Sequence, residues 1–222
     1  MNAMRIILAP MYVPVHFSET DLTCLDWLAS HDSFGTLISR ADDAPFATHL
    51  PVLYRRDGSH VTLTGHWARP NPQWSSIAGQ RVLFIFHGPH AYISPRWYAD
   101  PQRNVPTWNY ATAHLYGRVQ LIHEPEKLEE IVVSLADQYE QGAASPWRLA
   151  NSDRKPLLRG IVGFELVVDA IELKFKLNQN HIAENVQGAI AGLSAGGSAN
   201  ARTIARLMQE ALVKRGGKAD PG

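Results

Sequence analysis

Residues 34–54 read FGTLISRADDAPFATHLPVLY, and this stretch decides the fold class. Two runs rich in β-branched and aromatic residues flank a turn at 41–43, as in two neighbouring strands. Further runs of this kind recur along the chain, so that six or seven short strands are expected. This pattern predicts an antiparallel β-barrel. The expected strands are Phe34–Ser39, Phe46–Tyr54, Val61–His66, Val82–His87, Tyr110–Ile122 and a strand pair or one bent strand at Ile161–Leu177.

Helical patterns lie outside these strands. Ser18 followed by Asp21 is a plausible N-cap signal for a short helix that runs to about Ser30. Pro125 suits a first helical position, and an apolar stripe predicts a helix over 125–140. The tail reads as two helices with a break at 195–198.

The composition limits the class of protein. Of 222 residues, 45% are apolar and 19% charged, which suits a compact domain. Cys24 is the single cysteine, so no intramolecular disulfide is possible. We find no signal-peptide pattern and no apolar run that could span a bilayer, and we expect a soluble, cytoplasmic protein. The net charge is zero, which does not favour nucleic acid or an anionic membrane as a partner.

Positively charged and aromatic residues concentrate between residues 44 and 123. This segment holds seven arginines and two acids, Asp57 and Asp100. Arginine grips phosphate or carboxylate in a bidentate manner, and flat side chains stack on planar ligands. The segment therefore suits a planar, phosphate-bearing ligand. The alternatives are a chance excess of arginine, and aromatic residues that belong to the core or to a dimer interface.

Two polar groups interrupt the expected strands. Thr48 and His49 offer a hydroxyl and an imidazole in an otherwise apolar strand, although both could simply face solvent. Arg69 and Asn71 follow a strand end and place a guanidinium and an amide within one turn, suited to a phosphate or a heterocycle edge. Arg69 could instead be a structural pin for its loop. The stretch 94–109 is expected to be a long functional loop.

Other chemistries have weaker support. A Gly-Pro turn in 87–90 could bring His87 and His90 together, but no glutamate or cysteine is nearby, so no metal site is predicted. A haem ligated by one of the histidines is a minor alternative. The chain shows no nucleophile elbow and no phosphate-cradling glycine loop.

Several long motifs, in order, resemble the PaiB family of FMN-binding negative transcriptional regulators over about residues 9–193. The motifs are FGTLIS (34–39), PFATHLP (45–51), LTGHWARPNPQW (63–74), GPHAYISPRWY (88–98), VPTWNY (105–110) and KFKLNQN (174–180).

The resemblance implies a mainly β fold with flanking helices (α+β): a split β-barrel of the FMN-binding, pyridoxamine-phosphate-oxidase-like type. Residues 1–180 would form this domain, and 181–222 a helical tail that packs on the barrel or on a dimer partner. It also implies a homodimer with FMN at the subunit interface. The residues expected to bind FMN are Thr48, His49, Leu50, His66, Arg69 and Asn71, with Trp108 and Asn109 closing the site, from the partner subunit in one arrangement.

Three functions remain open at this level. The resemblance implies a repressor that binds FMN, with DNA as a partner. The tail could mimic a helix-turn-helix with Arg202 and Arg206 early on its second helix, but its apolar stripe favours packing on the barrel. The second function is a flavin-dependent oxidoreductase that uses His66 or His49 as a proton donor. The third is a flavin store without turnover.

Overall fold

The computed structural model describes residues 11–41, 43–140, 142–143 and 154–216. Eight strands form one antiparallel sheet system in the order β3-β2-β6-β7-β8-β5-β4, with β1 paired to β8. The strands are β1 Ser18–Glu19, β2 Phe34–Ala41, β3 Ala44–Pro51, β4 Leu53–Asp57, β5 His60–Ala68, β6 Arg81–Ile93, β7 Thr107–Ile122 and β8 Ile161–Lys176.

The helices lie between and after these strands. They are α1 Leu22–His31, α2 Gln73–Ser76, α3 Pro125–Glu140, α4 Arg154–Leu158, α5 Ala183–Ala195 and α6 Ala199–Gly216, with 3-10 turns at Val15–Phe17, Pro95–Trp97 and Pro101–Arg103. The helix predicted over 125–140 and the two tail helices are confirmed. Of the predicted pair Ser18 and Asp21, Asp21 is the N-cap of α1, because its carboxylate accepts the Thr23 N–H at 2.9 Å, whereas Ser18 lies in β1. No described helix is long and apolar enough to cross a membrane.

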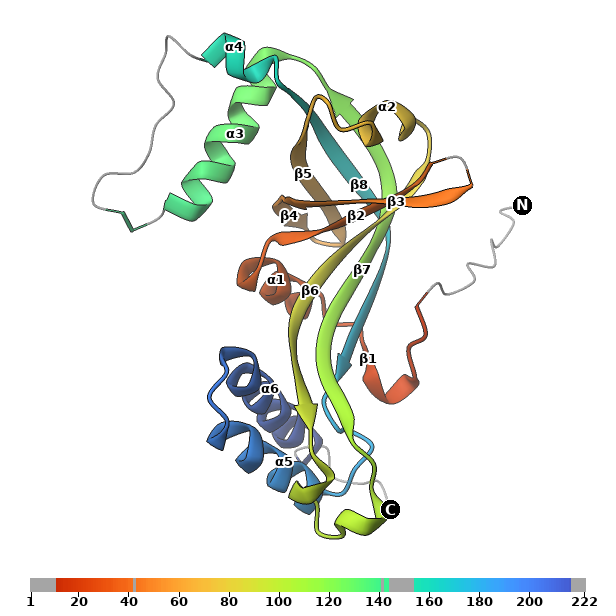
Figure 1. Ribbon diagram of the computed structural model, residues 1–222, viewed down its shortest axis with the longest axis vertical. Coiled ribbons are helices and arrows are strands. Elements are labelled where there is room, and N and C mark those ends of the chain that lie inside the picture. The colour runs from red at the N-terminus through yellow and green to blue at the C-terminus, as the bar shows by residue number, and fades with distance from the viewer. Residues whose placement is uncertain (1–10, 42, 141, 144–153, 217–222) are drawn as a thin grey trace. The chain divides into compact units, whose positions relative to one another are not determined.

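The chain forms two compact units that are each assembled from separate segments. Among the described residues, unit 1 comprises 11–20, 88–112 and 172–216, and unit 2 comprises those that lie within 21–87 and 113–171. The long strands β6, β7 and β8 contribute residues to both units (Figure 1). The domain boundary expected at residue 180 stays a prediction.

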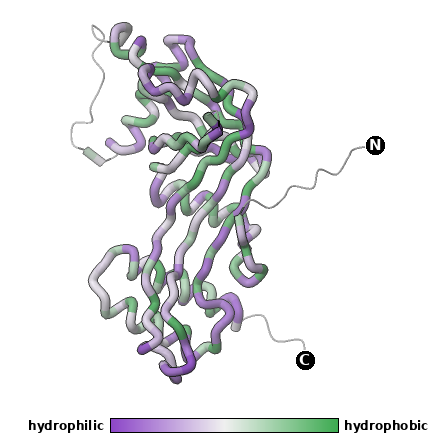
Figure 2. Tube along the Cα trace, turned by 45° about the vertical axis from the view of Figure 1, so that its right-hand side comes forward, coloured by the Kyte–Doolittle hydropathy of each residue, from purple (hydrophilic) through white to green (hydrophobic). Residues whose placement is uncertain are grey.

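Unit 2 contains the barrel core. Buried and more exposed positions alternate along β5, so one face of this strand is buried. Figure 2 shows hydrophobic and hydrophilic residues following one another along the strands. Trp67 and Phe164 pack with ring centroids 4.5 Å apart. Gly65 lets two strands approach closely, because a Cβ there would lie 2.9 Å from the Phe164 ring and 3.1 Å from the Pro51 carbonyl oxygen. The helix α3 covers β4 and β5 on the outside (Figure 1).

Two local expectations differ from the structure, and one open alternative is decided. The strand expected at Phe46–Tyr54 is divided into β3 and β4 at Val52, whose N–H donates to the Ser33 carbonyl at 3.1 Å. Of the two alternatives for Ile161–Leu177, a strand pair or one strand, the structure has one strand, Ile161–Lys176. The stretch expected to be a loop, 94–109, contains two 3-10 turns, and β7 already begins at Thr107.

Candidate functional site

Thr48 and Asn71, which the sequence placed in one site, meet in unit 2. The Asn71 Nδ2 donates a hydrogen bond to Thr48 Oγ1 at 3.0 Å, and its Oδ1 accepts the Gln73 N–H at 2.9 Å. Thr48 lies on β3, and Asn71 lies in the segment between β5 and α2. The pair therefore links the segment that follows β5 to β3 and leaves a hydroxyl and an amide side by side.

Gln73 supports this pair from inside the barrel and was missed as a site residue. Its side chain is fully buried, and its Nε2 lies within hydrogen-bond distance of Leu37 O, Ser39 Oγ and Phe46 O at 3.0–3.2 Å. Its Oε1 accepts the Trp67 Nε1–H at 2.9 Å. One amide thus ties β2, β3 and β5 to the site segment. The sequence feature that could have identified Gln73 is its place in the motif at 71–74, where a glutamine follows Asn-Pro.

His49 points to one face of β3, and its neighbours Thr48 and Leu50 point to the other. Leu50 pairs with Gly35 and is buried in the core, whereas His49 pairs with Thr36 on the other face and is exposed. Period-two alternation therefore separates His49 from Thr48 and Leu50. A direct contact of Leu50 with a ligand stays a prediction.

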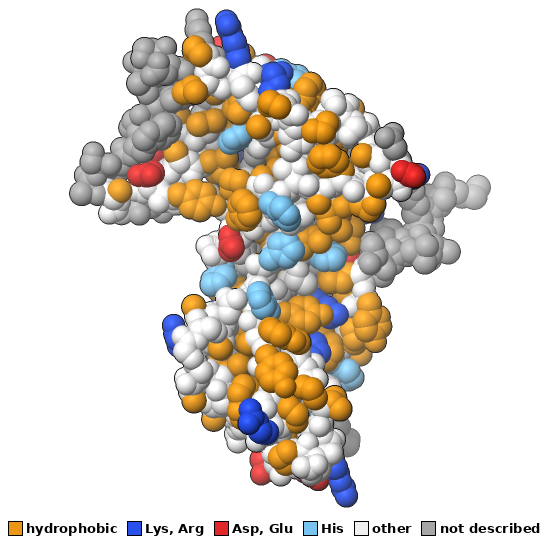
Figure 3. Space-filling view, viewed as in Figure 1, with side chains coloured by type: hydrophobic (Ala, Val, Ile, Leu, Met, Phe, Trp, Pro, Cys, Tyr) orange, Lys and Arg blue, Asp and Glu red, His pale blue; other side chains and the backbone are white. Residues whose placement is uncertain are grey.

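His49 belongs to a small hydrogen-bonded cluster on that face. The Oγ1 of Thr36 lies 2.9 Å from His49 Nδ1 and 2.8 Å from His87 Nε2. A threonine hydroxyl carries a single hydrogen, so it donates to at most one of the two imidazoles and accepts an N–H from at least one. The tautomers of the two histidines are therefore linked, because the two ring nitrogens that face Thr36 cannot both lack a hydrogen. Figure 3 shows histidine side chains reaching the molecular surface among apolar side chains.

His66 is half-buried on β5, and its Nδ1 atom is buried and unused. Among the described residues, no hydrogen-bond partner reaches its Nδ1. Burial lowers the pKa of this imidazole below its usual value of 6.5, which favours the neutral ring at neutral pH. A buried ring nitrogen without a partner is a feature that a bound ligand or a water molecule would satisfy.

Arg69 is tied to the turn that precedes β8. Its Nε donates to the Arg159 carbonyl at 2.5 Å, and its Nη2 donates to the Ile161 carbonyl at 2.8 Å. Its own carbonyl accepts the Trp74 Nε1–H at 2.8 Å. These bonds support the structural role weighed for this residue. The guanidinium has five N–H groups, so these two bonds leave donors for a further contact.

Two of the seven arginines in the segment 44–123 form ion pairs with acids from elsewhere in unit 2. Arg56 forms an ion pair with Asp26 and thereby holds the pKa of that carboxyl below its usual value. Arg81 Nη2 lies 2.7 Å from Asp169 Oδ1. The excess of arginine is thus in part structural, and Arg69 is the arginine bonded next to the Thr48–Asn71 pair.

The Gly-Pro turn that a metal site at His87 and His90 would require is absent from this segment. Gly88 and Pro89 lie within the continuous strand β6, which extends through Ile93. Across the described ranges, no group of three or more His, Cys, Asp or Glu side chains could hold a metal ion.

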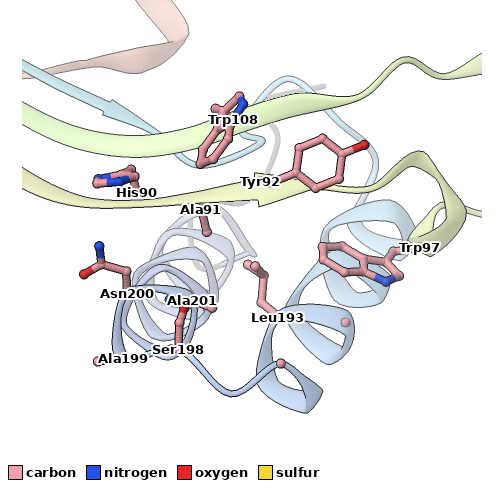
Figure 4. A pocket seen from close by; sticks show the side chains of 12 residues that line it. His90, Ala91, Tyr92, Trp97, Trp108, Leu193, Ser198, Ala199, Asn200 and Ala201 are labelled. Carbon is pink, nitrogen blue, oxygen red and sulfur yellow. Dashed lines mark hydrogen bonds between the residues drawn. The ribbon is translucent and has the colours of Figure 1, made fainter.

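Trp108 and Asn109 lie in unit 1, on opposite faces of β7. Asn109 is fully buried, and its Nδ2 lies 3.3 Å from Met208 Sδ of α6. Trp108 is 53% exposed and forms part of a pocket with His90, Tyr92 and Trp97, which Figure 4 shows. Closure of the FMN site by these two residues stays a prediction.

The tail helices in unit 1 bury their apolar faces. Ile204, Leu207 and Met208 of α6 are buried. Arg202 donates to the Gly197 carbonyl at 2.7 Å, and Arg206 pairs with Glu210 at 2.6 Å. The two arginines considered for a helix-turn-helix thus have partners within the tail.

Comparison with known proteins places the chain among flavin-related sequences. Residues 11–170 match the family described as "Putative FMN-binding domain". The chain is 37% identical over 209 residues to "Protease synthase and sporulation protein PAI 2" of Bacillus subtilis, which covers 92% of this chain and 100% of the relative. An uncharacterized protein of Emericella nidulans is 26% identical over 244 residues, covering 90% and 97% of the two chains.

Solved structures share the fold at low sequence identity. The FAD and heme binding protein from Mycobacterium smegmatis superposes with a TM-score of 0.57 at 17% identity, over 82% of this chain and 80% of that chain. The flavocytochrome Anf3 from Azotobacter vinelandii gives 0.55 at 14% identity, over 72% and 69%. The expected fold is confirmed: a split β-barrel of the flavin-binding type with flanking helices. Family and fold together support a flavin as the ligand class.

Proposed function

The chain belongs to the PaiB family of FMN-binding-domain proteins, and on that premise we propose that it binds FMN through β3 and the segment after β5. The observation that carries this proposal is the Thr48–Asn71 hydrogen bond, which joins two motifs far apart in sequence into one polar site. His49, on the other face of β3, and the buried Nδ1 of His66 add ring nitrogens in unit 2.

These side chains fit the chemistry of FMN. The amide of Asn71 and the hydroxyl of Thr48 both donate and accept, as the ribityl chain and the heteroatoms of the isoalloxazine edge require. The further N–H donors of Arg69 suit the phosphate. We assign Leu50 an apolar contact with the ring, and Trp108 and Asn109 of a partner subunit to the closure of the site. FMN bound there would supply redox and light-absorbing chemistry that the side chains lack.

We propose a homodimeric, FMN-binding regulator as the biological role. The name of the Bacillus subtilis relative connects that protein with protease synthesis and sporulation, and it supports a regulatory role here. DNA or another protein is the proposed partner. Retardation of a promoter fragment from the chain's own operon, with and without FMN, tests the role. Retardation that is the same with and without FMN would argue against a flavin-controlled regulator.

A second function, a flavin-dependent oxidoreductase, is favoured by one observation. The hydroxyl of Thr36 joins His49 and His87, so a proton accepted by one imidazole can be passed to the other. Such a relay suits proton delivery during flavin reduction or reoxidation. Oxidation of a nicotinamide donor by the FMN-loaded protein tests it, and a Thr36→Val variant should lower that turnover about 10- to 100-fold.

FMN binding itself is tested by calorimetric titration of flavin-stripped protein. Wild type should bind FMN saturably, and Asn71→Ala should weaken the affinity by about 1–2 kcal/mol through loss of an amide contact and of the Thr48 bond. Asn104→Ala is the matched control, because Asn104 lies in unit 1 and donates only locally, to the Asp100 carbonyl at 2.7 Å. Equal affinities for wild type and Asn71→Ala would exclude this site.

A further inference from the structure

A pocket of about 580 Å³ lies entirely within unit 1. Its volume is in the range of small-molecule sites. One wall is made by β6, the turn after it and β7, and the other by the end of α5 and the first turn of α6 (Figure 4). The lining residues are His90, Ala91, Tyr92, Trp97, Trp108, Gly192, Leu193, Gly196, Ser198, Ala199, Asn200 and Ala201.

The two walls differ in the size of their side chains. The first carries the aromatic side chains. The Trp108 ring lies 6.0 Å from Tyr92 and 6.1 Å from His90, measured between centroids. Tyr92 and Trp108 remain 46% and 53% exposed, although burial of such rings is strongly favourable. The opposite wall is made mostly of glycine, alanine and serine, so the space between the walls is a slot.

Trp97 is fixed at one end of this slot by α5. A Cβ at Gly192 would lie 2.3 Å from the Trp97 ring, so only glycine allows the indole to lie against the helix at this point. His90 and Asn200 lie at the other end of the slot in Figure 4. The slot thus has a rigid aromatic end and a polar end.

The charge of the slot also constrains its ligand. The twelve lining residues include no lysine, arginine or carboxylate, and His90 is the one titratable side chain among them other than Tyr92. The polar groups available are an imidazole, an amide and hydroxyls, which bond to ring heteroatoms and carbonyls. We propose that this slot, defined by Trp97, Trp108, Gly192 and Ala201, binds a planar, uncharged heteroaromatic ring system.

Such a ring has two sources, which share this chemistry. It is either a small molecule other than FMN or the isoalloxazine of a second FMN, bound apart from the Thr48–Asn71 site; this second source rests on the proposed function, which makes FMN a ligand of the chain. The proposal gives α5 and α6 a ligand-binding role in either case.

The test uses the full chain stripped of flavin, with lumiflavin, an isoalloxazine that lacks the ribityl phosphate, as the probe. Equilibrium dialysis should show saturable binding to wild type. Ala201→Trp fills the slot and Trp108→Ala removes a wall, and each should weaken binding about tenfold or more. Ala211→Trp places the same ring on α6, at a residue that is half-buried like Ala201, and should bind as wild type does.

Ala201→Trp titrated with FMN distinguishes the two sources, whereas Trp108→Ala does not, because the proposed function also places Trp108 at the FMN site. Equal losses for FMN and lumiflavin identify the slot's ligand as the flavin ring, whereas unchanged FMN affinity identifies a separate aromatic ligand; both outcomes support the slot. Lumiflavin binding that survives Ala201→Trp and Trp108→Ala overturns it. If Asn71→Ala abolishes lumiflavin binding while the slot variants retain it, the slot fails and the FMN site stands. If lumiflavin binding depends on the slot residues and FMN does not bind at all, the slot stands and the proposed FMN site fails.

Discussion

At the scale of single residues, the site depends on buried polar groups, most of whose donors and acceptors have hydrogen-bond partners. Gln73 shows this most clearly, because one fully buried amide contacts atoms of β2, β3 and β5. Nothing in the alternation of polar and apolar residues marked it, since a glutamine after Asn-Pro reads as a surface turn. His66, by contrast, was expected to face a ligand and has a buried Nδ1 without a described partner.

Replacement of Gln73 by alanine should destabilise the fold by about 2–4 kcal/mol. The variant removes packing and leaves the Trp67 Nε1–H and several carbonyls without their bonds. Urea denaturation measures the change in the free energy of unfolding. Gln102→Ala, at an exposed position, should stay within about 0.5 kcal/mol of wild type. A loss below about 1 kcal/mol would show that water takes over the role of the amide.

The lowered pKa of His66 predicts a pH dependence of stability. Because burial disfavours the protonated ring, the unfolded chain binds the proton more readily than the folded chain does. Stability from this residue is therefore intact above about pH 6.5 and declines as the pH falls through the unfolded pKa. The loss of stability is complete once the pH lies below the lowered pKa that His66 has in the folded chain. Denaturation from pH 8 to 4 should show a steeper acid loss for wild type than for His66→Gln.

His60→Gln provides the control for this pH series, because His60 is an exposed histidine on the same strand. Its profile should follow that of wild type. Parallel acid losses for wild type and His66→Gln would contradict the burial argument for His66.

At the scale of elements, the strands were predictable, because the runs of β-branched residues, the alternation of polar with apolar residues and the positions of the turns indicate the same segments. The division of β3 from β4 was not, because it depends on the bond from the Val52 N–H to the Ser33 carbonyl, which no local pattern shows. The contact of α5 with the turn at Pro95–Trp97 was equally hidden. It requires Gly188, where a Cβ would lie 2.0 Å from the Trp97 carbonyl oxygen.

Gly188→Ala should therefore destabilise the protein, although glycine to alanine inside a helix ordinarily stabilises by about 0.5–1 kcal/mol. The added methyl group meets backbone, which cannot rotate away, and we expect a loss of about 1–3 kcal/mol. Thermal unfolding followed by circular dichroism measures it. Gly197→Ala adds the same group where no atom lies within 4 Å and should have little effect. A stabilised Gly188→Ala variant would show that α5 does not pack as described.

At the scale of the whole molecule, the family and the split β-barrel were predictable from long motifs in the correct order. The composition of the two units was not, because β6, β7 and β8 each belong partly to both. The candidate site was predicted in part. Thr48 and Asn71 meet, whereas His49 and Leu50 face opposite sides of one strand. Thr36 and His87 were missed because their link to His49 arises from pairing between strands.

The central claim, that FMN binds through β3 and the segment after β5, is tested most directly by NMR of the histidine rings during an FMN titration. The account predicts saturable shifts of the His49 and His66 ring signals at one FMN per chain. His31, which stacks on Trp27 of α1 with centroids 5.1 Å apart, should keep its signals. Saturation with FMN that leaves His49 and His66 unshifted would contradict the account.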